Sequence, residues 1–206
     1  MDSIMHFEPV SLNASILYFK DSISPEILTQ VQHTFHLMRE IEGIIDVTPS
    51  YTSLLIEYDT ALHSHLSLEK VIKTMLKEAS PNTTTGHKHI QIPTDYSKGE
   101  DLASVAKYHN LSIEEVIHLH SSTLYRVYAI GFMVGFAYLG TLPAELFTPR
   151  RSTPRAKVPK GAVAIADKQT AVYPQQSPGG WNIIGHTDFD DFGSFSIGDS
   201  VEFIRI

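Results

Sequence analysis

The sequence predicts an α+β protein built in two parts, and three features support this prediction. In the first 93 residues the apolar pattern switches between strand and helix in the order strand, helix, strand, strand, helix, strand. From residue 94 onward, two short helical segments precede many short strands separated by turn residues. Segment 131–181 is dense in glycine, aromatic residues and arginine. We therefore expect two domains, 1–93 and 94–206.

Composition limits the classes of protein that need consideration. Of the 206 residues, 42% are hydrophobic and 19% are charged, which is typical of a globular protein. The net charge of -7 argues against non-specific binding of nucleic acid over the whole surface. The absence of cysteine excludes a disulfide framework and a thiolate zinc site. Residues 1–6 lack the pattern of a signal peptide, and no apolar run is long enough to span a bilayer, so we expect a cytoplasmic protein.

The first domain begins with a strand and a helix that have clear local signals. Residues 14–19 are rich in alternating apolar side chains, which favours a strand. Ser24 is suited to cap a helix, and Pro25 is suited to its first position. Apolar residues recur at helical spacing through 27–41, and Gly43 follows as the expected end.

Four further elements complete the prediction for this domain. Segments 44–48 and 53–58 are predicted strands joined by a turn, and Ser67 is predicted to cap the second helix. Segment 88–93 is predicted to close the domain as its last strand. This order of elements is that of a ferredoxin-like fold.

The second domain is expected to open with two helices and continue as β-structure. Residues 102–110 form the first helix, and Ser112 with Glu115 forms a capping box for the second. Two short helices suggest a helix-turn-helix, but they carry acids and few cations, which argues against DNA binding. A strand at 124–130 and a short helix at 142–147 follow. Further strands are expected at 162–166, 169–173, 181–185 and 201–206, and so many short strands favour a barrel or sandwich.

Segment 150–160 contains three arginines and two lysines but no acid. Arginine offers a planar set of donors that matches a carboxylate or a phosphate, so this loop is a candidate anion site. The alternative is a solvated basic loop, or one paired with acids such as Asp188, Asp190 and Asp191. The residues alone leave these two interpretations equal.

Several other side chains are candidates for chemistry. His120 is a candidate acid or base, Gln169 can bind an amide, and Tyr173 and Trp181 can wall a pocket. No catalytic triad, phosphate-binding loop or nucleophile elbow is evident, which predicts a site shared with a partner. Histidine pairs in the first domain lack a third ligand at a suitable spacing, so we expect no metal site.

The second half of the chain also resembles a known family. The segments YRVYAIGFMVGFAYLG, LFTPRRSTPRAKVPKGAVAIADKQTAVYPQQSPGGWNIIGHT and DDFGSFSIGDSVEFIRI are similar to the KipI/PxpB family, also called allophanate hydrolase subunit 1-like. The resemblance implies that the second domain is a cyclophilin-like β-barrel. The sequence departs from the family pattern at Val134, Ala171 and His186, and at Asn13-Ala14, which puts the usual substrate specificity in question.

The resemblance implies a subunit of a bacterial ATP-dependent 5-oxoprolinase, a hydrolase that converts 5-oxoproline to glutamate. Such a subunit is active only with PxpC-like and PxpA-like companions, and ATP is used through the complex. The alternative from the same family is an inhibitor of a sensor histidine kinase. A stand-alone prolyl isomerase is a third class, but a shared fold does not establish that function.

The residues and the resemblance together predict one site at the mouth of the barrel. The predicted catalytic residues are His120, Arg150, Arg155 and Gln169. The predicted substrate-binding residues are Gly131, Phe132, Gly135, Phe136, Tyr138, Tyr173, Gly179, Gly180 and Trp181.

Overall fold

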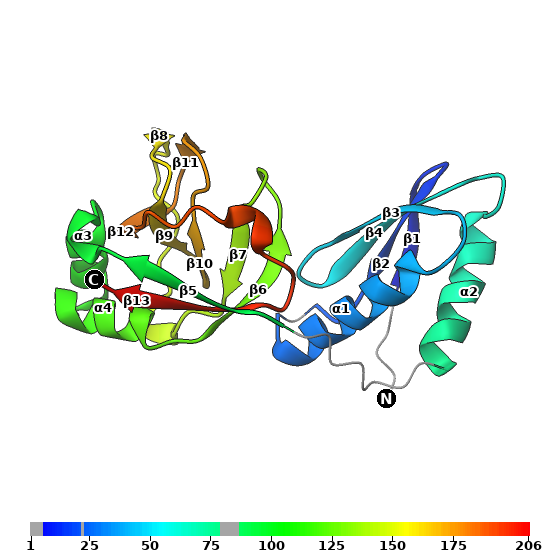
Figure 1. Ribbon diagram of the computed structural model, residues 1–206, viewed down its shortest axis with the longest axis horizontal. Helices are drawn as coiled ribbons and strands as arrows, with labels where there is room; N and C mark the ends of the chain where they lie inside the picture. Colours follow the sequence, from blue (N-terminus) through cyan, green and yellow to red (C-terminus); the bar gives the residue numbers. More distant parts are fainter. Residues whose placement is uncertain (1–5, 22, 79–86) are drawn as a thin grey trace. The chain divides into compact units, whose positions relative to one another are not determined.

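The structure, a computed structural model, describes residues 6–21, 23–78 and 87–206. The chain forms two compact units, Met1–Gly86 and His87–Ile206 (Figure 1). Residues 1–5, on which the expectation about a signal peptide rests, lie outside the described residues. Within the described part of the chain, no helix is long and apolar enough to cross a membrane.

The first unit is a four-stranded antiparallel sheet packed against two helices. Its elements are β1 (His6–Ser11), β2 (Ala14–Tyr18), α1 (Pro25–Arg39), β3 (Ile44–Pro49), β4 (Ser53–Tyr58) and α2 (His65–Glu78). The strand order is β1-β2-β4-β3, and the apolar face of the sheet shares one core with α1 and α2. Ser24 caps α1 by accepting the N–H of Ile27 at 3.3 Å, as predicted. Helix α2 begins ahead of Ser67, whose hydroxyl lies in the first turn and accepts the N–H of Ser64.

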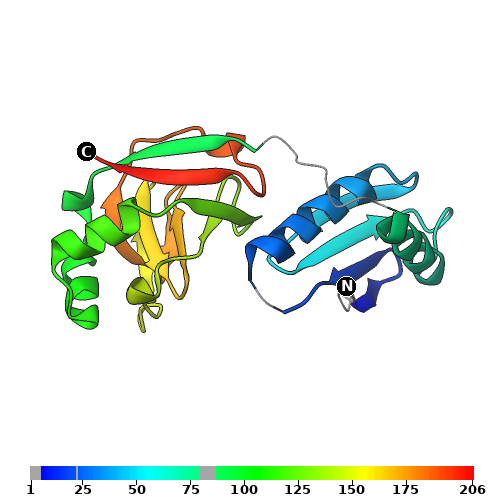
Figure 2. The ribbon, with the colours of Figure 1, turned by 90° about the horizontal axis from the view of Figure 1, so that it is seen from below.

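The predicted closing strand of the first domain belongs to the second unit instead. Strand β5 (His89–Thr94) pairs in parallel with β13 (Ser200–Arg205), and Figure 2 shows the two side by side. The unpredicted strand β1 takes the sheet edge beside β2. The prediction that segment 88–93 completes a ferredoxin-like domain was therefore wrong. An alternating segment shows that a strand will form, but not which sheet it will join.

The second unit is a seven-stranded sheet that closes almost completely into a barrel. Besides β5 and β13, this sheet contains β6 (Tyr125–Ile130), β7 (Ala137–Gly140), β9 (Ala162–Ala166), β10 (Gln169–Val172) and β12 (Asn182–His186). Two further strands of the unit, β8 (Arg155–Val158) and β11 (Ser177–Gly179), lie outside it. The order in the main sheet is β12-β9-β10-β7-β6-β13-β5. Asp95, directly after β5, exchanges backbone hydrogen bonds of 2.8 and 3.0 Å with His186 of β12. These bonds join the two edges of the sheet.

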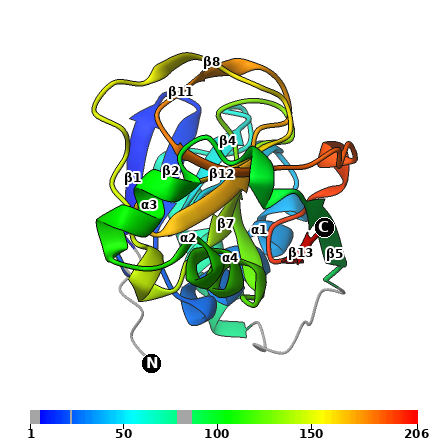
Figure 3. The ribbon, with the colours of Figure 1, turned by 90° about the vertical axis from the view of Figure 1, so that its left-hand side faces the viewer.

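Two helices and a ribbon surround this barrel. Helices α3 (Leu102–His109) and α4 (Ile113–Ser121) pack against the main core beside β12 and β13 (Figure 3). Strands β8 and β11 form a separate two-stranded ribbon, and neither strand was among those predicted. The predicted helix at 142–147 is only a 3₁₀ turn, Ala144–Leu146.

Strand β9 is buried on both of its faces, and this separates two apolar clusters. Val163 and Ile165 belong to the main core of the barrel. Ala162, Ala164 and Ala166 point to the opposite face and join a second cluster that includes Trp181 and Tyr173. Small alanine side chains leave room there for large aromatic rings, so the second cluster is where the structure builds a pocket.

Candidate functional site

A pocket of about 240 Å³ lies between this second cluster and the ribbon of β8 and β11. It brings together eight predicted site residues: Phe132, Phe136, Tyr138, Arg150, Tyr173, Gly179, Gly180 and Trp181. Pro154 and Pro178, which were not among the predicted site residues, complete the lining. The pocket lies on the face of the sheet opposite the main core.

Phe136 is the centre of the aromatic wall of this pocket. Its ring is 1% exposed and packs edge-on against Tyr138 at 4.8 Å, Tyr173 at 5.3 Å and Trp181 at 5.8 Å between ring centroids. Phe132, at the rim, packs edge-on against the same ring at 5.4 Å. Edge-to-face pairs of this kind each contribute about 0.5–1.5 kcal/mol beyond area burial. The wall is therefore fixed in shape before any ligand arrives.

Glycines allow the backbone to approach this wall closely. A Cβ atom at Gly179 would lie 2.3 Å from the hydroxyl oxygen of Tyr173, so no larger residue fits there without a shift. Gly135 has a φ of +81° and packs against Phe192. Gly131 and Gly135 do not line the pocket, but they bound the loop that carries Phe132 to its rim.

The two tyrosines of the pocket stay protonated at neutral pH. Burial raises the pKa of Tyr173 and of Tyr138 above the usual value for a phenol, although the positive charge of Arg150 opposes this shift in both. Neutral hydroxyl groups can donate as well as accept hydrogen bonds. The pocket wall therefore offers polar groups without negative charge.

Of the residues that line the pocket, Arg150 alone is charged. Hydrogen bonds hold the backbone on either side of it. The N–H of Arg151 donates to the carbonyl of Gly180 at 2.8 Å, and the side-chain amide of Asn182 donates to the carbonyl of Pro149 at 3.0 Å. The guanidinium of Arg150 lies 5.8 Å from the centre of the Trp181 ring. These contacts fix a cation at the edge of an aromatic pocket.

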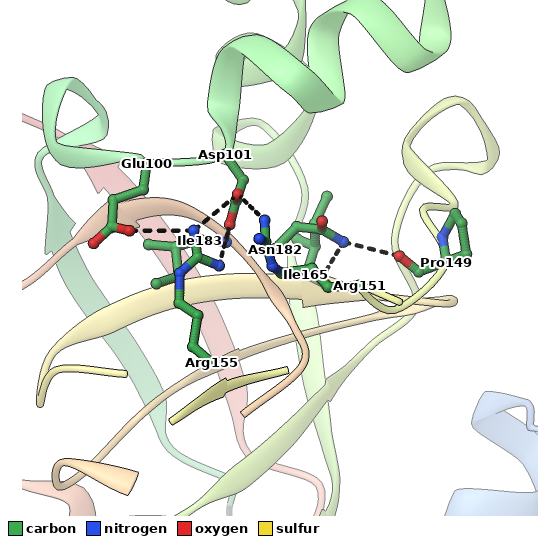
Figure 4. Close-up of polar contacts among 8 residues, drawn as sticks. All are labelled: Glu100, Asp101, Pro149, Arg151, Arg155, Ile165, Asn182 and Ile183. Atoms are coloured by element: carbon green, nitrogen blue, oxygen red, sulfur yellow. Dashed lines mark hydrogen bonds and ion pairs between the residues drawn. The ribbon is translucent and has the colours of Figure 1, made fainter. Parts of the chain in front are cut away.

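Arg155, a predicted catalytic residue, lies outside the lining and belongs to an ion-pair network (Figure 4). The carboxylate of Asp101 accepts two hydrogen bonds from Arg155 at 2.8 and 2.9 Å, one from Arg151, and one from the N–H of Ile183 at 2.8 Å. Asp101 is 3% exposed, and its hydrogen bonds raise the pKa of Arg155. This network connects the start of α3 to the basic loop and to β12.

The charge of the basic loop is therefore largely satisfied within the protein. Besides the network of Asp101, Arg155 pairs with Glu100 at 3.1 Å, and Lys160 pairs with Asp190. The sequence suggested Asp190 as a partner, but Asp101 lies about 50 positions away in the chain and was missed. Arg150 also pairs with Asp167, at 3.3 Å, but it is the cation of segment 150–160 that lines the pocket. The interpretation of the whole segment as one anion site is therefore narrowed to Arg150.

His120 and Gln169 also lie outside the pocket. His120 is fully buried in the main core, where its ring nitrogens bond the hydroxyls of Tyr96 at 2.7 Å and Thr170 at 2.8 Å. Gln169 is in β10, paired with Gly140 and Ala166. The expectation that His120 and Gln169 line the pocket is therefore corrected. For His120 the reason is that the local sequence does not show whether a histidine at the end of a helix points into the core.

Burial lowers the pKa of His120 from 6.5 to about 3. Below pH 6.5 the unfolded chain takes up a proton that the folded chain does not accept. The free energy of unfolding should therefore fall on acidification, with His120 contributing up to about 1.4 kcal/mol per pH unit. We expect His120→Gln to have a shallower dependence between pH 6.5 and pH 5 in urea unfolding. Equal slopes in the wild-type protein and in His120→Gln would contradict this assignment.

Metal ligands are not gathered in the described residues: no group of three or more His, Asp or Glu side chains there could hold an ion. The chemistry that the pocket supports is binding. It can hold a small ring against aromatic faces, give it neutral hydrogen-bonding partners, and place a guanidinium at one end.

Comparison with known proteins relates the chain to one family. A family model for the carboxyltransferase domain, subdomain C and D, matches residues 5–196. The B subunit of the 5-oxoprolinase of Bacillus subtilis is 33% identical over 220 aligned positions, which cover 97% of this chain and 92% of that protein. The Haemophilus influenzae protein of the same name is 48% identical over 126 residues, 57% of this chain and 59% of the relative.

A solved structure extends the comparison to the fold. The crystal structure of TTHA0988 superposes with a TM-score of 0.82 at 34% identity. The match covers 95% of this chain and 40% of that protein, so the chain corresponds to less than half of the longer molecule. Both units described above therefore fall within the matched region.

Proposed function

Because the chain belongs to the family of the carboxyltransferase domain, subdomain C and D, we propose that it is the B subunit of a bacterial ATP-dependent 5-oxoprolinase. The observation that carries this proposal is the similarity to the corresponding Bacillus subtilis 5-oxoprolinase chain over nearly the whole length of both proteins. The same family membership supports a cyclophilin-like description of the barrel. No observation favours the alternative of a kinase inhibitor.

The pocket suits the substrate of this reaction. 5-Oxoproline is a small ring that carries a lactam and one carboxylate. A pocket of about 240 Å³ is below the range of roughly 300–1,000 Å³ usual for drug-sized ligands, so it suits a molecule of this size. The aromatic walls can cover the faces of the ring, and the neutral phenols of Tyr138 and Tyr173 can bond to the lactam.

The same pocket does not fit ATP. A triphosphate carries several negative charges, whereas the residues that line the pocket include one positive charge, that of Arg150. We propose that ATP is bound and used on companion subunits, one PxpC-like and one PxpA-like, in the cytoplasm. The part played by this chain would be to bind and orient the ring and to exclude water from its faces.

Reconstitution tests this proposal directly. The purified chain alone should release almost no glutamate from 5-oxoproline and ATP, because its pocket offers no group to activate the lactam. Adding both companion subunits should restore glutamate release, and omitting this chain from the mixture should abolish it. Undiminished activity of the two companions without this chain would refute the proposal.

A further inference from the structure

Arg150 has donors that the folded chain does not use. Its Nε donates to a carboxylate oxygen of Asp167 at 3.3 Å. Neither of its two terminal NH₂ groups has an acceptor among the described residues. The neighbouring Arg151 and Arg155 differ in this respect, because their terminal groups are bound to Asp101. Arg150 is thus a cation held at a pocket with two adjacent donors still available.

The position of these donors is set before a ligand binds. The backbone on either side of Arg150 is bonded to Gly180 and Asn182, the two neighbours of Trp181. The guanidinium lies over the Trp181 ring, and Asp167 holds its Nε edge. Holding a group in its binding position lowers the entropy lost on association.

We propose that Arg150 binds the carboxylate of the ligand through its two terminal NH₂ groups, and that Asp167 is a positioning residue for this contact. The inference rests on the proposed function and assigns the orientation of the substrate within the pocket. The carboxylate lies at the rim against Arg150, and the ring extends inward along Trp181 toward Tyr138 and Tyr173. The ligand class is a small lactam ring bearing one carboxylate.

Arginine suits this role because its planar fork bonds both oxygens of a carboxylate at once. A lysine at the same place would supply a point charge without that geometry. Removing a charge-assisted contact of this kind weakens binding roughly ten- to a hundredfold. A neutral amide in place of the carboxylate should therefore bind much more weakly to the wild-type protein.

Asp167 acts through Arg150, and its expected effect is smaller. The side chains of Asp167 and Arg150 are 60% and 59% exposed. An ion pair between exposed side chains changes a binding equilibrium by up to about fivefold. Asp167 has a φ of +53°, a conformation that asparagine and glycine adopt readily. Asp167→Gly removes the contact without backbone strain, and Asp167→Asn keeps an oxygen that can accept from Nε.

Trp181 makes the binding experiment specific, because it is the single tryptophan of the chain and lines the pocket. Its fluorescence should change saturably when 5-oxoproline is added, and much less with the neutral amide of 5-oxoproline. In Arg150→Ala the dissociation constant for the acid should rise about ten- to a hundredfold, and the preference for the acid should disappear. Lys157→Ala removes an equal charge from an exposed position on β8 and should retain wild-type binding.

The aspartate variants separate positioning from structure. Asp167→Gly should weaken binding of the acid by about three- to fivefold, without changing binding of the amide, and Asp167→Asn should restore most of the loss. The site assignment is overturned if Arg150→Ala still prefers the acid, or if the wild-type protein binds the acid no more tightly than the neutral amide. A Gly variant that binds the acid as tightly as wild type would show that Asp167 does not position Arg150.

These results are independent of the test of the enzyme. Preferential binding of the acid without glutamate release by the assembled subunits would retain the carboxylate site and reject the oxoprolinase. An active complex whose KM for 5-oxoproline is unchanged by Arg150→Ala would retain the oxoprolinase and reject the carboxylate site.

Discussion

Asp101→Ala is expected to destabilise the second unit by roughly 3–5 kcal/mol, because it removes one partner from a buried ion-pair network. The carboxylate of Asp101 is 3% exposed and accepts four hydrogen bonds, three of them from Arg151 and Arg155. Without it, Arg151 and Arg155 lose the buried carboxylate that they share, Arg155 is left with the exposed Glu100, and the N–H of Ile183 is left unpaired. Urea unfolding followed by Trp181 fluorescence measures the loss.

Glu100→Ala is the matched control for this change. Glu100 is the preceding residue, its side chain is 57% exposed, and it also pairs with Arg155. An exposed pair contributes about 0–1 kcal/mol, so this variant should unfold close to the wild-type midpoint. If both variants lost the same free energy of unfolding, the burial of Asp101 would not explain the destabilisation.

Gly135→Val should have an effect of similar size, for a different reason. Gly135 has a φ of +81°, and a Cβ atom there would lie 2.7 Å from the Cβ atom of Phe192. A left-handed conformation costs a side chain about 1–2 kcal/mol, and overpacking adds about 1–3 kcal/mol. We expect a total loss of roughly 2–5 kcal/mol in thermal or urea unfolding.

Gly131→Val provides the comparison at the other end of the same loop. A Cβ atom at Gly131 would meet nothing within 4 Å, and its φ is not in the left-handed region. This variant should therefore keep nearly the wild-type stability. If the two substitutions were equally harmful, the contact between Gly135 and Phe192 would not explain the loss.

Local signals in the sequence predicted the starts of α1 and α4, because a helix begins through contacts between near neighbours. They misplaced the start of α2 and predicted a helix at 142–147 where the structure has a 3₁₀ turn. Ser24 with Pro25, and Ser112 with Glu115, specify helix starts that the structure contains. Strand partners were harder to predict. Segment 88–93 was correctly expected to be a strand, but its partner lies more than a hundred residues away at β13. Strand β1 was missed because most of its side chains are exposed and it shows little apolar alternation.

The candidate site was predictable where its residues are close in sequence or share an obvious chemistry. The aromatic and glycine residues of segment 131–181 indeed form one pocket. The sequence could not assign the roles of the cations, because these depend on which acid reaches them in space. Asp101 pairs with Arg155, whereas Arg150, five residues earlier in the chain, keeps two donors available at the pocket.

The parallel pairing of β5 with β13 constrains how the protein can be made. His89 and Ser200 meet across this pair although 111 residues separate them. A ribosome adding about 5–20 residues per second needs roughly 6–22 s to cover that distance. During this interval the apolar side chain of Ile92 has no partner strand, whereas the sheet of the first unit is complete once β4 has emerged. We therefore expect the first unit to fold early during synthesis and the barrel to fold late. In the nascent chain β5 stays unpaired, and prone to aggregation, until β13 has been made.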